Sequence, residues 1–183
     1  MAGGKSQSGV MPERRAARLV VVSPGCRVLL MRYRGEAAGD PAKTGVGDFW
    51  VTPGGGVEAG ETVARAAARE LREETGIVRS AAALGGPVGE READLWVGGV
   101  LTRCFEWFFV VRVDSEVIDR AGWTDSERID VTAVRWFGAD ELRRSGDWDD
   151  ELGPRGAGWF FAACAEGDAP AGVTRLDAGA GRG

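Results

Sequence analysis

Three glutamates at helical spacing are the residues of this chain whose types and positions point most directly to chemistry. Glu70, Glu73 and Glu74 stand at positions i, i+3 and i+4 in a stretch rich in alanine and arginine. In an α-helix these positions lie on one face, within an arc of roughly 100°. Like charges repel at a cost of about 0.2–0.5 kcal/mol for an i, i+4 pair, so the cluster favours a bound cation.

A hard divalent cation would suit such a cluster. Mg²⁺ prefers oxygen ligands, accepts one or two carboxylates, and leaves its other positions to water and substrate phosphate. A Pro-Gly-Gly-Gly turn precedes the helical stretch, and glycine lets a backbone approach a ligand closely. The alternative is a solvated Glu/Arg helix after an ordinary turn, which the glutamates taken alone would favour.

The spacing of these residues decides between the two interpretations, because it resembles the Nudix box, G-x5-E-x7-R-E-U-x-E-E-x-G-U with U aliphatic. The match holds at every position over Gly55–Ile77. A motif with this many fixed positions in one register is a strong signal. The chain is therefore identified as a member of the Nudix hydrolase family (MutT-like). The matching residues are Gly55, Glu61, Arg69, Glu70, Leu71, Glu73, Glu74, Gly76 and Ile77.

The resemblance implies hydrolysis of a phosphoanhydride bond in a nucleoside diphosphate linked to another moiety, such as an NTP or a nucleotide sugar. It implies Mg²⁺ or Mn²⁺ as cofactor and a small nucleoside diphosphate derivative as partner. A divalent cation suits the reaction because it polarises the phosphoryl group and lowers the pKa of bound water. The residues assigned to the metal are Glu70, Glu73, Glu74 and Gly55.

The resemblance also assigns residues that support the metal site or contact the substrate. Arg69 is expected to position Glu73 or its neighbours rather than to contact substrate, and Glu61 is expected to complete the outer shell. The candidate substrate contacts are Gly54, Gly55, Gly56 and Arg32.

Nudix proteins often recruit another acidic residue from outside the motif, as a metal ligand or general base. Glu106 interrupts an otherwise apolar strand, so we expect it to face a wet cleft or a cation, because a buried unpaired carboxylate is costly. Glu127 lies in a polar loop before the last strand. For both residues a plain surface position is the alternative. With Glu70, Glu73, Glu74 and Arg69, these two complete the candidate catalytic set.

The elements that must position these residues are a strand and a helix. A strand over 48–52 leads into the glycines. The helix begins at about 61 or 62, with Thr62 as a usable N-cap, and ends at Thr75, where Gly76 supplies the stop. A stripe of small apolar residues beside the glutamates lets the helix press closely against a sheet.

The rest of the chain predicts a Nudix-type α/β/α sandwich with a mixed central sheet, in the α/β (α+β) class. A length of 183 residues suits one domain. We expect a flexible N-terminal arm over 1–16, the Nudix hydrolase domain over 17–169 and a frayed tail over 170–183. The predicted strands are 18–23, 27–33, 81–84, 95–101, 103–113 and 131–137; a loop covers 114–130, and helices cover 139–144 and 156–166.

Composition excludes several classes of function. The formal charge is −5 with no basic stripe, which argues against a nucleic-acid partner. No apolar run approaches the roughly 18 residues of a membrane span, and the N-terminus lacks the apolar region of a secretory signal. Three cysteines, an odd count, indicate reduced, buried thiols in a cytoplasmic protein. The absence of histidine excludes Ser-His-Asp triads and His-ligated zinc.

Two other functions are known for this fold. A non-catalytic sensor of a nucleotide metabolite usually carries a degraded motif, whereas this one is intact. An isoprenoid-diphosphate isomerase would need histidine ligands, which the chain lacks. The substrate moiety is open: the Ser-Gln-Pro-Trp array of NADH pyrophosphatases is absent, and Ala93 stands about where ADP-ribose hydrolases place a proline. A homodimer is left open as well.

Overall fold

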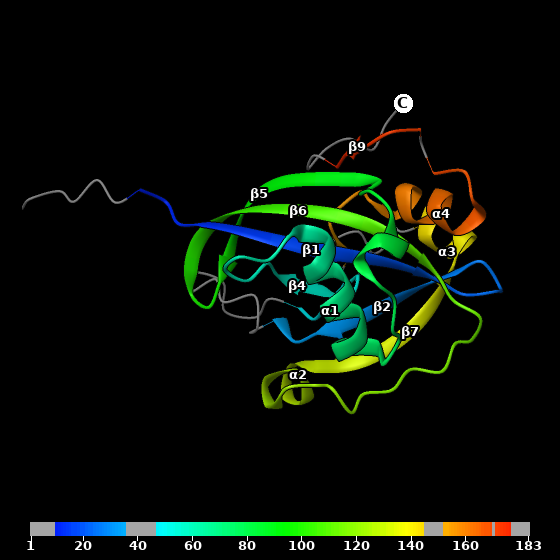
Figure 1. Cartoon of the computed structure of the whole chain (residues 1–183), viewed down its shortest axis with the longest axis horizontal. Coiled ribbons are helices and arrows are strands. Elements are labelled where there is room, and N and C mark those ends of the chain that lie inside the picture. Colours follow the sequence, from blue (N-terminus) through cyan, green and yellow to red (C-terminus); the bar gives the residue numbers. More distant parts are fainter. Residues whose placement is uncertain (1–9, 36–46, 145–151, 170, 177–183) are drawn as a thin grey trace, which may run out of the picture.

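A curled mixed sheet forms the middle layer of the molecule (Figure 1). Helix α1 (Val63–Thr75) packs on one face, and helices α3 (Ala139–Arg143) and α4 (Gly158–Glu166) lie over the other. This computed structural model describes residues 10–35, 47–144, 152–169 and 171–176. The arrangement confirms the predicted α/β/α sandwich with a mixed sheet.

Nine strands of the described residues join in this sheet, along the path β8-β3-β2-β1-β6-β5-β9, with β4 paired to β1 and β7 paired to β2. The strands are β1 (Glu13–Val22), β2 (Arg27–Tyr33), β3 (Phe49–Val51), β4 (Gly54–Gly56), β5 (Gly89–Val97), β6 (Val100–Arg112), β7 (Val131–Gly138), β8 (Leu152–Gly153) and β9 (Thr174–Arg175).

Strand β1 shares one of its edges between two neighbours. Along its whole length it runs parallel to β6. On the other edge it pairs with β2 only at Val22, and its earlier part, Ala16–Arg18, pairs antiparallel with β4. Strand β4, hereafter the glycine strand, is therefore held against an earlier part of β1 than the end at which β1 pairs with β2.

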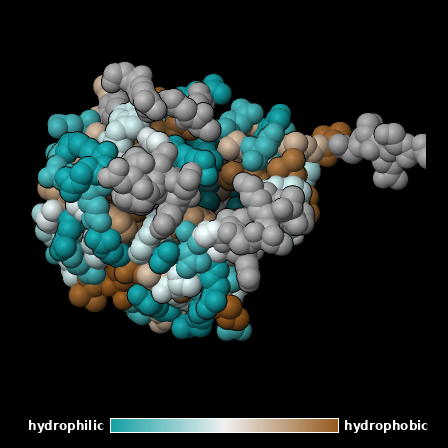
Figure 2. Space-filling view, turned by 180° about the vertical axis from the view of Figure 1, so that it is seen from behind, coloured by the Kyte–Doolittle hydropathy of each residue, from teal (hydrophilic) through white to brown (hydrophobic). Residues whose placement is uncertain are grey.

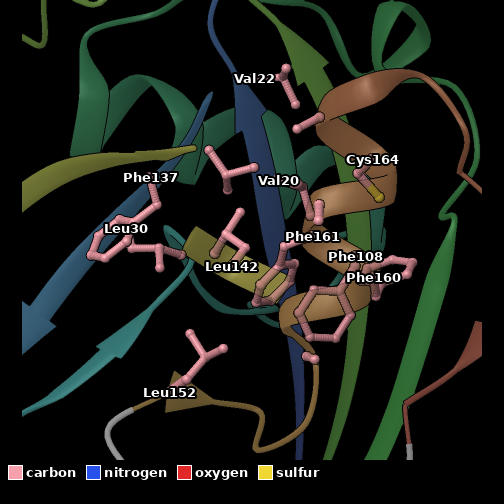
Figure 3. Packing of buried hydrophobic residues seen from close by; sticks show 14 of the residues in the cluster. Val20, Val22, Leu30, Phe108, Phe137, Leu142, Leu152, Phe160, Phe161 and Cys164 are labelled. Carbon is pink, nitrogen blue, oxygen red and sulfur yellow. The ribbon is translucent and has the colours of Figure 1, made fainter. Parts of the chain in front are cut away.

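Alternating side chains of β1 feed two cores, as the period of two in a strand requires. Leu19 and Val21 pack in the cluster that includes Leu71 of α1. Val20 and Val22 point the other way, into a cluster with the aromatic side chains of α4, chiefly Phe160 and Phe161, which Figure 3 shows in contact with Phe108 of β6. The sheet thus anchors α1 and α4 independently.

Helix α1 begins and ends where the sequence predicts. The Thr62 side chain accepts a hydrogen bond from the Arg65 N–H, as an N-cap does. Gly76 has φ 74°, and its N–H donates to the Arg72 carbonyl, which closes the C-terminal end. These caps fix the register of the glutamates relative to the glycine strand.

Three local predictions were wrong. Residues 81–84 form a 3₁₀ helix, η2 (Ala81–Leu84), rather than a strand, because the Ser80 side chain caps its first turn. The hairpin between β5 and β6 turns at Gly98 and Gly99, both with positive φ, so β5 is earlier and longer than expected. A short helix, α2 (Asp125–Asp130), forms within the predicted loop.

The described residues also extend beyond the expected domain limits. β1 begins at Glu13, inside the segment expected to be an arm, and β9 pairs with β5 inside the segment expected to be a frayed tail. The predictions for 1–9, 170 and 177–183 lie outside the described residues.

The surface seen from behind is largely hydrophilic, with separate apolar patches (Figure 2). In the part of the chain that the structure describes, no helix is both long and apolar enough to traverse a membrane. The three cysteines are unpaired; Cys104 and Cys164 are buried as expected, whereas Cys26 is exposed at the β1–β2 turn.

Candidate active site

Glu74 is the most deeply buried carboxylate of the glutamate cluster, at 2% exposure. Its Oε2 accepts a hydrogen bond from the Gly54 N–H at 2.5 Å, and its Oε1 accepts one from the Tyr33 hydroxyl at 3.3 Å. Burial, and after it the negative charge of Glu70, raises the pKa of the Glu74 carboxyl to about 8. Hydrogen bonds therefore hold the Glu74 carboxylate in place, but its surroundings disfavour its negative charge.

Glu70 lies beside the glycine strand and is also buried. Burial raises its pKa, although Arg69 opposes this by donating to its Oε1 at 2.7 Å. A Cβ at position 55 would lie 2.6 Å from the Glu70 Cδ, too close for real atoms. The backbone at Gly55 thus touches the Glu70 carboxylate, which agrees with the close approach expected from the sequence, and a larger residue there would displace that side chain.

Arg69 links the acidic residues of the motif to the backbone of the glycine strand. Its guanidinium donates to Glu61 at 3.1 and 3.3 Å, to Glu70, to Glu73 at 3.2 Å and to the Gly56 carbonyl at 2.8 Å. The hydrogen bonds with Glu61 contribute most to a pKa of Arg69 above its ordinary value, and they hold the pKa of Glu61 below its own. Arg69 therefore fixes the carboxylate of Glu61, which precedes the helix, together with those of Glu70 and Glu73 on the helix.

Glu73 is the most accessible of the three clustered glutamates, with its side chain 35% exposed. Its two oxygens accept from Arg69 and from the Arg72 guanidinium at 3.1 Å.

The segment before α2 is hydrogen-bonded to the C-terminal end of α1. The Trp123 indole N–H donates to the Glu74 carbonyl at 2.8 Å, and the Asp119 N–H donates to the Thr75 carbonyl at 3.0 Å. A Cβ at Gly122 would lie 2.5 Å from the Glu73 carbonyl oxygen, so this segment also packs directly on the helix backbone. These contacts fix the helix end that carries the glutamates.

Glu127 belongs to α2, where it forms a capping box with Thr124. Its negative charge is among the causes that raise the pKa of Glu70, Glu74 and Tyr33. The structure therefore brings Glu127 into the electrostatic neighbourhood of the glutamate cluster.

Glu106 lies on β6, 3% exposed, between two arginines. Its Oε1 is 2.8 Å from the Arg18 Nε, and its Oε2 is 3.0 Å from an Arg91 nitrogen. Burial opposes ionisation, yet the two guanidinium charges hold the pKa of Glu106 below its usual range. Glu106 does face cations, as expected, but they are arginines, and both of its oxygens are already occupied.

Arg32 contacts Trp50 and Asp48. Its guanidinium lies 5.9 Å from the Trp50 ring centroid and 3.7 Å from a carboxylate oxygen of Asp48. The structure brings Glu61, Arg69 and the three clustered glutamates against the glycine strand. Glu127 lies in their electrostatic neighbourhood, and Glu106 is connected to the glycine strand through Arg18.

Three residues in this region were not singled out from the sequence: Arg18, Tyr33 and Trp123. The available signals were an arginine inside the β-branched run of β1 and the one tyrosine of the chain at the end of β2. Neither signal names a partner, because the partners are distant in sequence.

The donor set fits a divalent cation, although the side chains do not converge on one point. Among the described residues, no group of three or more Asp, Glu, His or Cys side chains is arranged to hold a metal ion. Glu70 and Glu73 turn toward Arg69, and Glu74 turns toward Gly54. However, two buried carboxylates with raised pKa values are the groups that a hard cation would stabilise.

A groove of about 450 Å³ borders the same glycine strand, within the size range of small-ligand sites. It lies between the start of β1 and the loop that leads into α1. Its lining residues are Glu13, Arg14, Arg15, Gly56, Val57, Glu58, Ala59, Gly60 and Glu61.

Comparison with known proteins gives matches of sequence and of fold. The NUDIX domain family model matches residues 12–155. Over 69 residues the chain is 45% identical to an octanoyltransferase of Myxococcus xanthus, and this match covers 36% of the chain and only 17% of that longer protein.

Solved structures with the same fold include a MutT protein from Methanosarcina mazei, with a TM-score of 0.58 and 18% identity over 88% of this chain and 96% of the other. A NUDIX-family hydrolase from Clostridium perfringens gives 0.56 with 12% identity, covering 85% and 98%. An ADP-ribose pyrophosphatase from Streptococcus suis gives 0.54 with 14% identity, covering 90% and 98%.

Proposed function

Because this chain belongs to the NUDIX domain family of pyrophosphohydrolases, we propose that it hydrolyses a phosphoanhydride bond in a nucleoside diphosphate linked to another moiety, with Mg²⁺ or Mn²⁺ as cofactor. The observation that carries the proposal is the contact of two buried carboxylates, Glu70 and Glu74, with the backbone of the glycine strand. This contact gathers two acidic side chains against the glycine strand.

The residues of the site have two proposed roles, metal binding and the orientation of the metal ligands. Glu70, Glu73, Glu74 and the backbone of Gly55 would hold the cation, which when bound polarises the phosphoryl group and lowers the pKa of water. Arg69 orients Glu70 and Glu73 through its shared guanidinium. Orientation of this kind contributes to rate because reacting groups must be aligned before the chemical step.

We assign proton acceptance from the attacking water to Glu127 rather than to Glu106. Glu127 belongs to α2, and the segment just before α2 is hydrogen-bonded to the end of α1 that carries Glu74, whereas both oxygens of Glu106 are ion-paired with arginines. A carboxylate that is already paired twice would have to give up an arginine before it could take a proton.

The proposed substrate is a small nucleotide derivative rather than a nucleic acid, which agrees with the net charge of −5. One structural neighbour is named as an ADP-ribose pyrophosphatase, so ADP-ribose belongs in a substrate screen. The unpaired cysteines support a cytoplasmic location.

The test is a screen of the full-length protein against NTPs, nucleotide sugars, ADP-ribose and dinucleotides, with and without Mg²⁺ or Mn²⁺. We expect release of phosphate, pyrophosphate or a nucleoside monophosphate from at least one compound. Glu73→Gln and Glu74→Gln should each lose activity by about 10-fold or more. Glu92 is an exposed residue of β5, so Glu92→Gln is the matched control and should retain activity. Binding of a nucleotide without turnover would instead favour a sensor.

A further inference from the structure

We propose that Arg18 and Glu106 are positioning residues of the metal site: Glu106 anchors Arg18, and Arg18 holds the backbone of Gly54, whose N–H bonds the carboxylate of Glu74. The inference rests on the proposed function in so far as Glu74 is a metal ligand. It also gives Glu106 a role other than the catalytic one expected from the sequence.

The first step is the anchoring of Glu106 from both sides of β6. In the β5–β6 pair Arg91 stands directly opposite Glu106, and in the β1–β6 pair Ala16 does. Arg18 follows two residues after Ala16 and so projects from the same face of β1. One carboxylate, with 4% of its side chain exposed, is thus gripped by arginines from two neighbouring strands.

The second step is the link from Arg18 to the glycine strand. While its Nε is bound to Glu106, its second guanidinium nitrogen donates to the Gly54 carbonyl at 3.3 Å. The two residues are register partners in the β1–β4 pair, and a Cβ at Gly54 would lie 2.9 Å from the Arg18 Cα. Gly54 also has φ 138°, a backbone conformation that suits glycine. Arg18 therefore holds a backbone position that few residues other than glycine could occupy.

The third step is the effect on Glu74. The other side of Gly54, its N–H, donates to the Glu74 Oε2 at 2.5 Å. Because Glu74 is nearly excluded from solvent, its orientation depends on this bond and on the weaker one from Tyr33. Groups that orient a metal ligand from behind typically change metal affinity by about 10- to 100-fold when they are removed. A shift of the Gly54 backbone should therefore weaken metal binding.

A guanidinium is suited to this role. Its donors lie in one rigid plane, so a single side chain can bond the Glu106 carboxylate and the Gly54 carbonyl together. A lysine at position 18 would keep the charge and could pair with Glu106, but as a compact ammonium it would not reproduce the fork.

The experiment compares Arg18→Gln with Arg91→Gln, its matched control. Each variant removes one arginine from the same carboxylate, but only Arg18 contacts Gly54. We expect similar drops in Tm for the two variants. Mn²⁺ affinity, measured from the EPR signal of free Mn²⁺ without substrate, should fall by about 10-fold or more in Arg18→Gln and by clearly less in Arg91→Gln, which loosens Glu106 but leaves the Arg18 bond to Gly54 in place. On a hydrolysed substrate, kcat should follow the loss of metal affinity while KM changes little.

Arg18→Lys keeps the test decisive if Arg18→Gln does not fold. We expect Arg18→Lys to recover thermal stability but to keep the weakened Mn²⁺ binding. Equal Mn²⁺ affinities in the Arg18 and Arg91 variants, or full recovery of metal affinity by lysine, would overturn the inference. If wild-type protein binds Mn²⁺ but hydrolyses no compound in the screen, the proposed function fails, whereas the comparison of Mn²⁺ affinities still decides the role of Arg18.

Discussion

The indole N–H of Trp123 donates to the backbone carbonyl of Glu74 at 2.8 Å, so a residue from the segment before α2 closes the end of the helix that carries the glutamates. Trp123 is 7% exposed, and Arg120 stacks over its ring at 4.9 Å. The position of Glu74 is thus set through its backbone as well as through its side chain.

Trp123→Phe should weaken both the fold and the site. The substitution leaves the Glu74 carbonyl without its partner, which costs about 1–3 kcal/mol when the group is buried. Urea unfolding measures this loss, and steady-state kinetics should show a lower kcat. Trp136→Phe is a matched control because its indole also donates to a backbone carbonyl, that of Glu116 at 3.1 Å, away from the glutamates. A similar fall of kcat in both variants would contradict a local role for Trp123.

Gly55→Ala should damage the site by overpacking. The added methyl would meet the Glu70 carboxylate, with 2.6 Å to its Cδ, and must displace either the carboxylate or the strand. We expect weaker Mn²⁺ binding with only a small loss of stability in urea unfolding, because the atoms that must move are the far end of the Glu70 side chain. In Gly86→Ala the methyl meets no atom within 4 Å, so this variant should behave as wild type.

Arg69→Lys should lower activity although the charge is kept. One ammonium cannot replace the guanidinium that bonds Glu61, Glu70 and the Gly56 carbonyl at once. The expected result is a fall in kcat of about 10-fold or more, since Glu70 and Glu73 lose their common support. Arg65→Lys, on the exposed side of the same helix, should leave kcat unchanged.

Glu106→Gln should change how stability depends on pH. The pKa of Glu106 is held below its ordinary value of 4.5, so its contribution to stability is fully present above that pH and is lost as the pH falls through the lower folded value. We expect the variant to be less stable by about 3 kcal/mol at pH 7, with the gap to wild type closing in acid.

Urea unfolding at a series of pH values measures that gap. The control is Glu116→Gln, which breaks the more exposed ion pair with Arg27 and should have a small effect at every pH. A gap for Glu106→Gln that stays constant down to acid pH would mean that its charge does not contribute.

Divalent metal should stabilise the protein, because a ligand that binds only the folded state adds about 2.7 kcal/mol at 100 times its Kd. Mg²⁺ or Mn²⁺ should therefore raise Tm, and EDTA should reverse the rise. Glu74→Gln should abolish most of the shift, whereas Glu92→Gln should keep it. A metal-dependent rise of the same size in both variants would argue that the cation binds elsewhere.

The local parts of this site were predictable from sequence, and the long-range parts were not. Thr62, Gly76 and the glutamate spacing specify α1 because caps and helical periodicity are encoded by near neighbours. The partners of Glu106 come from β1 and β5, and strand pairing between distant segments leaves no local pattern to identify them. The 3₁₀ helix at 81–84 was missed because one serine cap outweighed the apolar run.

The attachment of β4 to β1 also bears on protein engineering. The chain from Pro53 to Val57 is fastened to β1 by backbone hydrogen bonds, including Leu19 N–H to the Pro53 carbonyl and Val57 N–H to the Arg15 carbonyl. A peptide that spans the motif alone would lose these bonds together with its β-sheet support. Transplanting the motif into another scaffold should therefore succeed only if a host strand equivalent to β1 is transplanted with it.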